Sequence, residues 1–255
     1  MILAIDIGNT SIALGGFDRD ELRFVSRLST DLRATQDEYA MRISGALALH
    51  GIDKHSVRGA IISSVVPPLN ETVKQALRFL FGQEPLTVGP GIKSGICIRC
   101  DMPSSVGADL IASAVAAHYL YQSPCLIIDI GTATKLSVVD EHGAFIGASI
   151  IPGIHMGLNA LAEQTAQLPK ISLETPGKVI AKNTVDSMRS GVLFGNASMI
   201  DGMIDRIHRE LDKDLLLLAT GGMASTVIPL CEHTIHVDET LILKGLHILY
   251  QKNHT

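Results

Sequence analysis

The 255-residue sequence has no tryptophan, and aromatic residues make up only 4% of it. With so few aromatic side chains, the chain lacks the platforms on which the bases of a single-stranded nucleic acid stack. Basic residues are also in the minority, and the formal net charge of −5 has the wrong sign for a phosphate backbone. We therefore expect a protein that binds no nucleic acid.

Long hydrophobic runs are missing as well. The best candidate, residues 110–120, is too short to cross a membrane and contains His118. The start, Met1-Ile2-Leu3, lacks the basic flank of a signal peptide. Only four cysteines are present, and they do not form the framework of a small secreted domain. We expect no membrane association, reduced thiols and a cytoplasmic location.

Several familiar catalytic motifs are absent too. No Gly-x-x-x-x-Gly-Lys-Ser/Thr run occurs, which excludes a P-loop nucleotide site. No Gly-x-Ser-x-Gly run occurs, which excludes the nucleophile elbow of the α/β-hydrolases. Cys97 and Cys100 have zinc or redox spacing, but no second pair follows them. Unpaired thiols are the preferred interpretation, and a metal or redox site is the alternative.

The sequence does contain one short pattern twice. Residues 2–11 read Ile-Leu-Ala-Ile-Asp-Ile-Gly-Asn-Thr-Ser, and residues 126–134 read Leu-Ile-Ile-Asp-Ile-Gly-Thr-Ala-Thr. The apolar part of each copy is typical of a strand buried on both faces, and the glycine and small polar residues of a tight turn. An aspartate inside such a run is costly unless its charge is used. Asp6 and Asp129 therefore either begin turns or serve a magnesium-phosphate group.

The second interpretation has a chemical basis. Backbone N–H groups of a Gly-Asn-Thr turn can cradle phosphate oxygens as an anion nest. A carboxylate such as Asp6 can hold a hard cation directly or through water. Two copies of the pattern, one at the start of the chain and one near its middle, indicate two similar halves that face one nucleotide.

Hydrophobic periodicity predicts the order β-β-β-α-β-α-β for the first half, followed by an irregular segment over residues 90–106 and an alanine-rich helix that ends at Tyr121. Thr35 and Glu38 have capping-box spacing and predict the start of the first helix. The expected strands span residues 2–7, 12–17, 22–28, 60–66 and 86–88, and the expected helices run from 35 to about 50 and from 69 to 80.

The second half is predicted to repeat this plan. We expect an N-terminal lobe of residues 1–121 and a C-terminal lobe of residues 122–255. The expected strands of the second lobe span residues 126–130, 136–139, 145–151, 215–220 and 235–237, and the expected helices span 155–164, 184–193, 197–210, a segment from 224, and 240–250.

Paired Asp-x-Gly turns that open β-β-β-α-β-α repeats resemble the actin-like ATPase superfamily of acetate kinases, sugar kinases, heat-shock ATPases and actin. This likeness implies an α/β fold of two similar ribonuclease H-like lobes. Within the superfamily the chain is similar to the type III pantothenate kinases. The matching segments follow the order of that family through nearly the whole chain: residues 6–10, 63–68, 107–109, 129–134, 152–153, 168–169, 183–184, 190–191 and 220–222.

The resemblance implies transfer of phosphate from ATP to the primary hydroxyl of pantothenate, the first step of coenzyme A biosynthesis. It also implies magnesium, held with ATP at Asp6, and a monovalent cation, potassium or ammonium, at Asp129. The residues implied to bind ATP are Asp6, Ile7, Gly8, Asn9, Thr10, Ser11, Ile12, Ala13 and Thr132.

The acceptor site is implied in the same way. Asp109 would take the proton from the acceptor hydroxyl, which suits a reaction that needs positioning, charge neutralisation and a carboxylate near the attacking oxygen. By its position before an apolar helix, Asp109 would also suit a plain helix N-cap. The family's habit of dimerising implies a homodimer with the acceptor pocket near the interface. The residues implied to contact pantothenate are Cys100, Gly107, Ala108, Asp109, Leu110 and Thr184.

Three positions depart from the family's pattern. Members usually have arginine at the position of Leu110, where it holds the pantothenate carboxylate, and tyrosine at the position of Cys100. They usually have threonine where this chain has Lys135. Either Lys135 replaces the lost positive charge, or Leu110 and Lys135 are ordinary drift in a working enzyme.

Two rival functions stay open beside the kinase. One is a kinase-like paralogue with a different acceptor, or a catalytically weak nucleotide-binding regulator. The intact Asp109 argues against a regulator that has lost catalysis, and the arginine missing at Leu110 argues for it. The other is a polymerising relative of actin, against which the short chain without large insertions argues.

Overall fold

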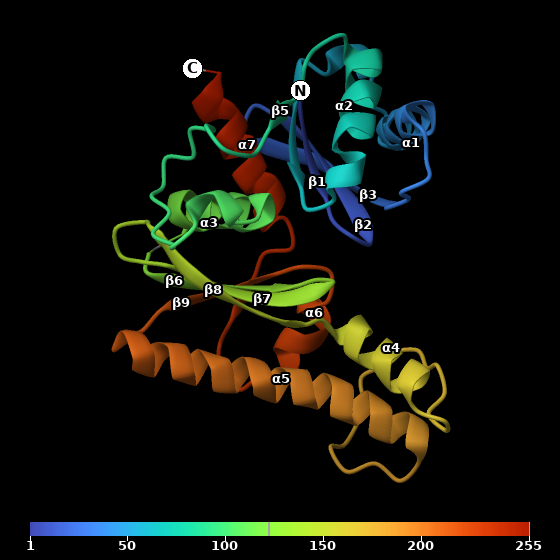
Figure 1. Cartoon of the computed structure of the whole chain (residues 1–255), viewed down its shortest axis with the longest axis vertical. Helices are drawn as coiled ribbons and strands as arrows, with labels where there is room; N and C mark the ends of the chain where they lie inside the picture. Colours follow the sequence, from blue (N-terminus) through green and yellow to red (C-terminus); the bar gives the residue numbers. More distant parts are fainter. Residues whose placement is uncertain (122, 255) are drawn as a thin grey trace. The chain divides into compact units, whose positions relative to one another are not determined.

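The computed structural model describes residues 1–121 and 123–254. Contacts between residues divide the chain into two compact units. Unit 1 comprises residues 1–121 and 240–255, and unit 2 comprises residues 122–239. Each unit is built on one five-stranded sheet with helices against it (Figure 1).

The sheet of unit 1 has the order β3-β2-β1-β4-β5. Strand β1 is antiparallel to β2 and parallel to β4, so it lies at the centre of the sheet with paired edges on both sides. These strands span Ile2–Ile7 (β1), Ser11–Asp18 (β2), Glu21–Ser29 (β3), Gly59–Ser64 (β4) and Leu86–Thr87 (β5).

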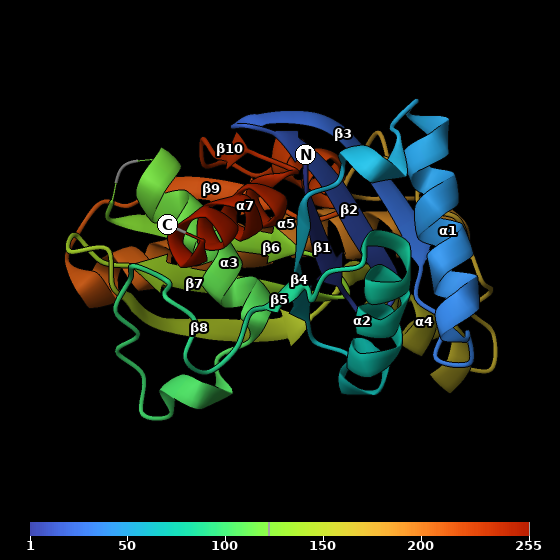
Figure 2. The same cartoon turned by 90° about the horizontal axis from the view of Figure 1, so that it is seen from above.

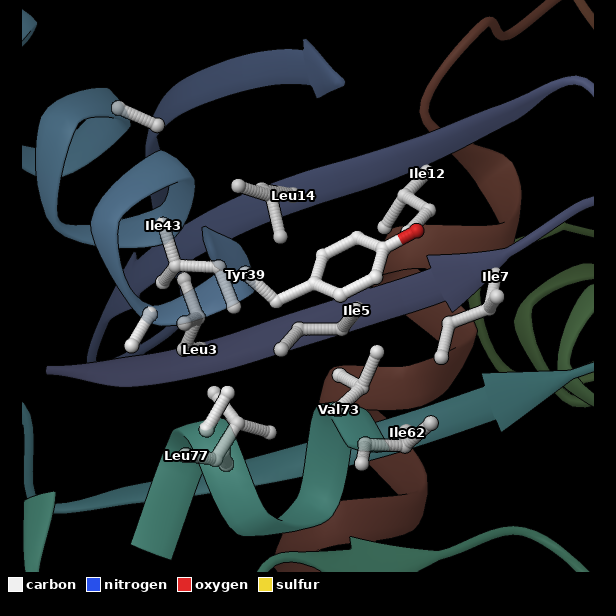
Figure 3. Packing of buried hydrophobic residues seen from close by; sticks show 14 of the residues in the cluster. Leu3, Ile5, Ile7, Ile12, Leu14, Tyr39, Ile43, Ile62, Val73 and Leu77 are labelled. Atoms are coloured by element: carbon white, nitrogen blue, oxygen red, sulfur yellow. The ribbon is translucent and has the colours of Figure 1, made fainter. Parts of the chain in front are cut away.

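Helices cover both faces of this sheet, which is why β1 is apolar at successive positions. Leu3, Ile5 and Ile7 pack into one core cluster together with side chains of α1 (Gln36–Leu49) and α2 (Pro67–Phe81), as Figure 3 shows. Ala4, between them in sequence, packs on the opposite face with α3 (Ala108–Leu120) and α7 (Leu241–Asn253). Successive side chains of β1 point to opposite faces of the sheet, so the strand contributes to two hydrophobic cores.

Local signals set the ends of the helices. Thr35 caps α1 through the predicted capping box, in which the Thr35 hydroxyl accepts the N–H of Glu38 and the Glu38 carboxylate accepts the N–H of Thr35. Helix α2 ends at Gly82, whose φ of 67° is the left-handed conformation that favours glycine. Short 3-10 turns, η1 (Lys54–Ser56) and η2 (Pro103–Ser105), lie in the connections.

The C-terminal helix α7 belongs to unit 1, whereas we expected all of residues 122–255 in one lobe. Its leucines at 243, 246 and 249 are buried against the sheet, and α7 lies beside α3 in both views (Figures 1 and 2). Gly245 meets the backbone of Ala112 so closely that a methyl group would overlap it. This helix is far from the first half in sequence, so only the tertiary packing assigns it.

The sheet of unit 2 has the order β10-β9-β6-β7-β8. Read from the opposite edge it repeats the order of unit 1, with β6 in the place of β1, which confirms the predicted fold class of two similar lobes. The strands span Cys125–Ile130 (β6), Ala133–Val139 (β7), Phe145–Pro152 (β8), Leu216–Thr220 (β9) and His236–Val237 (β10).

One face of this second sheet carries α4 (Ile154–Gln164), α5 (Thr184–Leu211), α6 (Ala224–Val227) and the 3-10 turn η3 (Ile228–Leu230). We expected two helices over residues 184–193 and 197–210, but α5 is one helix of 28 residues. Gly195 is the glycine between the two expected helices, and an interior glycine costs only about 1 kcal/mol. Burial of Leu193 and Ala197 on either side of it offsets that cost.

In the part of the chain that the structure describes, no helix combines the length and the hydropathy that crossing a membrane requires.

Candidate functional site

The first Asp-x-Gly turn joins β1 to β2 and is closed by backbone bonds. Gly8 donates its N–H to the carbonyl oxygen of Ser11 at 3.0 Å. Thr30, just beyond β3, donates its hydroxyl to the carbonyl oxygen of Gly8 at 2.6 Å and its N–H to that of Thr10 at 3.1 Å. Asn9 and Thr10 at the tip are exposed. The turn is therefore held from one side and presents its tip to solvent, and Thr30 is a supporting residue that no sequence motif indicated.

Asp6 lies near the carboxyl end of β1, and it has a neighbouring residue on the strand at each side. Its neighbour on β2 is Ala13, and its neighbour on β4 is Ser63. Ser63 is fully buried, and its hydroxyl has no hydrogen-bond partner among the described residues. A single carboxylate fits magnesium that arrives with ATP, because that ion is usually held by one or two carboxylates and the phosphates themselves. Within residues 1–121 and 123–254, no cluster of three or more metal-binding side chains occurs.

Asp109 occupies the first turn of α3 and is buried, with 7% of its surface exposed. It is not the N-cap, as the plain alternative had it, because Gly107 holds that position. Its Oδ1 accepts the N–H of Leu110 at 2.8 Å. A methyl group on Gly107 would lie 2.6 Å from this Oδ1, so glycine makes room for the carboxylate.

The structure brings the first turn and the start of α3 to the same edge of the unit 1 sheet. Strands β1 and β4 are parallel, and Val65 continues past β4 by donating its N–H to Ile7 O at 3.1 Å. A methyl group on Gly107 would lie 3.9 Å from the Val65 side chain. Asp6 shares its sheet face with Ala4, the face on which α3 packs. Ligands of α/β sheets bind at such carboxyl edges.

The predicted acceptor contacts carry no positive charge. Leu110 is buried in the first turn of α3. Cys100 is half-buried in the loop before α3, and burial, followed by the negative charge of Asp101, raises the pKa of its thiol. The thiol is therefore neutral near pH 7. Thr184, in unit 2, is the exposed first residue of α5, next to the cap formed by Asn183.

The second Asp-x-Gly turn joins β6 to β7 and contains an ion pair. Lys135 stands directly opposite Asp129 in the antiparallel pair, and its Nζ lies 2.7 Å from Asp129 Oδ2. The two side chains are only 17% and 11% exposed. Thr132, predicted to contact ATP, is exposed at the tip of this turn. Because an ammonium group already neutralises Asp129, these residues do not fit a free monovalent cation.

Two glycines enclose this turn. Gly153 packs against the carbonyl oxygens of Gly131 and Thr132, with no room for a methyl group. Gly221 has a φ of 95°, and a methyl group there would lie 2.6 Å from Asp129 Oδ1. Both glycines follow strands and would be read as turn residues from sequence alone, so their role depends on the tertiary structure.

Comparison with solved structures defines the class of the fold. A candidate 2-dehydro-3-deoxygalactonokinase from Sinorhizobium meliloti matches with a TM-score of 0.60 and 13% identity, over 98% of this chain and 96% of that one. Component A of the (R)-2-hydroxyglutaryl-CoA dehydratase from Acidaminococcus fermentans matches with a TM-score of 0.57 and 15% identity, over 98% and 96%. The fold is that of the actin-like ATPases and sugar kinases.

Sequence comparison then gives the family. Residues 2–206 match the family described as type III pantothenate kinase. The chain is also 40% identical over 257 residues to a type III pantothenate kinase of Brevibacillus brevis, covering 100% of both chains. The chain belongs to the type III pantothenate kinase family.

Proposed function

We propose that this protein transfers the γ-phosphate of ATP to the primary hydroxyl of pantothenate, the first step of coenzyme A biosynthesis. Family membership supports the reaction. The observation in the molecule that carries it is the buried carboxylate of Asp109, held at the start of α3 beside the carboxyl ends of β1 and β4. We place the base for the acceptor hydroxyl at this carboxylate as part of the proposal.

The N-terminal turn is the proposed phosphate site. Its backbone N–H groups and the hydroxyls of Thr10 and Ser11 suit phosphate oxygens, and Asp6 would hold magnesium with the nucleotide. Magnesium bound there neutralises charge that develops on the phosphates. Thr132, exposed on its own turn in unit 2, is proposed as a further contact to ATP.

Asp109 is proposed as the base. The acceptor oxygen attacks the γ-phosphorus, the bond from that phosphorus to the bridging oxygen of ADP breaks, and the hydroxyl proton passes to the Asp109 carboxylate. Phosphoryl transfer asks little more of the protein than this positioning and charge neutralisation.

The test is Asp109→Asn, measured as ADP formation with pantothenate and as ATP binding by calorimetry. Loss of a general base lowers turnover by about 10²–10⁴, while ATP binding should persist. Asp37→Asn is the matched control, because Asp37 is exposed and occupies the same second position in α1 that Asp109 occupies in α3. Unchanged turnover of Asp109→Asn would show that the carboxylate only stabilises the helix.

We further propose a homodimer in which Thr184 helps to bind the acceptor. A groove along α5 includes Gly191 and Gly195, where an added methyl group would meet nothing outside the helix's own backbone within 4 Å, and Ile180 beside it is 85% exposed. Apolar and small residues on one open face suit contact with a second copy. Sedimentation that shows only monomer at micromolar concentration would contradict the dimer. A cytoplasmic location, which the free thiols suit, stays a prediction.

A second candidate is a nucleotide-binding paralogue that is weak on pantothenate or uses another acceptor. The buried Leu110, which offers no donor to a carboxylate, favours it. Tight binding of ATP without turnover on pantothenate would support this candidate over the kinase.

A further inference from the structure

The Asp129–Lys135 ion pair distinguishes the second turn from the first. Asp6 and Asp129 hold equivalent places in the two sheets, at the ends of their central strands. The residue opposite Asp6 is Ala13, whereas the residue opposite Asp129 is Lys135. The residue opposite the aspartate therefore differs between the two repeats, and only the second aspartate has an ammonium group opposite it.

The backbone holds this pair in place. Directly opposite residues of antiparallel strands point to the same face with Cβ atoms about 4.5–5.5 Å apart. The lysine stem therefore reaches Asp129 Oδ2 without leaving the strand pair, and the Nζ–Oδ2 distance is 2.7 Å. Both side chains are mostly shielded from water, so exchange of the ammonium group for solvent is costly.

The other carboxylate oxygen is enclosed by backbone. A methyl group on Gly221 would lie 2.6 Å from Asp129 Oδ1, and one on Gly131 would lie 3.5 Å from it. With Lys135 on Oδ2 and glycine backbone beside Oδ1, a metal ion at this carboxylate would have to displace the ammonium group. It would also meet the repulsion of a like charge.

We propose that the Lys135 ammonium group replaces the monovalent cation at Asp129, so that this protein binds ATP without any requirement for potassium. The inference rests on the proposed ATP site. The charge is the same, since Lys135 supplies one positive charge as potassium or ammonium would. Tethering to β7 makes its delivery to Asp129 intramolecular and independent of the ionic composition of the solution. Lys135 is thus a positioning residue that acts through Asp129.

The experiment compares the parent with Lys135→Thr in potassium chloride and in tetramethylammonium chloride at equal ionic strength. The second cation is too large for a carboxylate enclosed by backbone. The readouts are the Kd for magnesium-ATP by calorimetry and the Tm of the protein without nucleotide. The parent should give the same values in both salts. Lys135→Thr should bind ATP more weakly in tetramethylammonium and regain affinity in potassium, by a factor in the range of about 5–150 that is typical of coupled sites.

Three control variants test whether the potassium response depends on the Asp129–Lys135 pair rather than on the loss of any lysine. Lys213→Thr removes a lysine from an exposed pair with Glu141 at 2.5 Å and should show no response to potassium. Lys135→Thr combined with Asp129→Asn should lose the potassium response of the single variant, because no carboxylate is left to bind the ion. Lys135→Arg keeps the charge and should stay independent of potassium.

Two results would overturn the proposal. One is a potassium-specific gain in ATP affinity or Tm of the parent, which remains measurable even if Lys135→Thr does not fold. The other is a folded Lys135→Thr variant whose ATP affinity and Tm are the same in both salts. A parent that binds no ATP in either salt would contradict the proposed function instead, and the Tm of the nucleotide-free protein would still decide on Lys135.

Discussion

Gly153, which caps α4, lies against the carbonyl oxygen of Thr132 with no space between them for a side chain. The contact joins the end of β8 to the turn between β6 and β7. Since Thr132 is exposed on that turn and is proposed to touch ATP, the position of a nucleotide contact depends on a glycine that is remote in sequence.

Gly153→Ala should therefore move the turn. Overpacking of this kind costs about 1–3 kcal/mol of stability, and the Kd for ATP should rise with it. Calorimetric titration and chemical denaturation measure the two effects. Gly157→Ala is the control, because Gly157 lies within α4 and an added methyl group there would meet nothing outside the helix's own backbone within 4 Å. This variant should gain about 0.5–1 kcal/mol of stability. Equal behaviour of the two variants would refute the role assigned to Gly153.

Asp6→Asn should cripple turnover and weaken binding of magnesium-ATP, because it removes the charge proposed to hold the metal ion. Titration with ATP in the presence and absence of magnesium should show that the loss is confined to the magnesium form. Asp18→Asn, at the far end of β2 and exposed, is the comparison. If Asp6→Asn turned over ATP at the parent rate, Asp6 would only begin a turn.

Pantothenate is expected to bind weakly to the parent. Removal of one partner of a buried charge pair costs about 2–5 kcal/mol, or roughly 30- to 4,000-fold in affinity. Leu110→Arg with Cys100→Tyr should lower the KM for pantothenate, measured as steady-state ADP formation. Leu110→Met with Cys100→Tyr tests whether charge rather than volume matters. Brisk turnover of the parent at an ordinary KM would show that the family's arginine is dispensable here.

Acid should destabilise unit 1 through His247. This side chain is 7% exposed and stacks on Phe17 with ring centres 4.3 Å apart. Burial lowers the pKa of His247 below its ordinary value of 6.5, although Asp20 at 3.4 Å opposes the shift. As the pH falls, His247 is therefore protonated in the unfolded chain at a higher pH than in the folded protein. The resulting stability is fully present above about pH 6.5 and is lost as the pH falls below it.

His247→Phe should keep the stacking and flatten the dependence of the unfolding free energy between pH 7 and the acid range. Denaturant titrations at several pH values measure this dependence. His155→Phe, at an exposed position, should leave the slope of the parent unchanged. A variant at position 247 that is as acid-sensitive as the parent would show that other groups control this range.

Hydrophobic pattern and turn chemistry alone predicted the strands from which the two sheets are built. The runs that end at Ile7 and Ile130, each followed by a glycine turn, place two central strands and their aspartates, because strand faces alternate with a local period of two. The same segments carry the family resemblance that the comparisons confirm. The candidate residues of both turns were therefore visible without any structure.

Only the tertiary structure decided which of the candidate residues lie close together. Helix α7 joins unit 1 because Gly245 fits the backbone of Ala112, a contact between residues far apart in the chain. Asp109 reaches the edge that carries Asp6 because β1 and β4 pair in parallel. Lys135 neutralises Asp129 because the shorter second turn sets the two residues opposite each other. This register depends on how β6 and β7 pair, and the sequence of either strand by itself does not specify it.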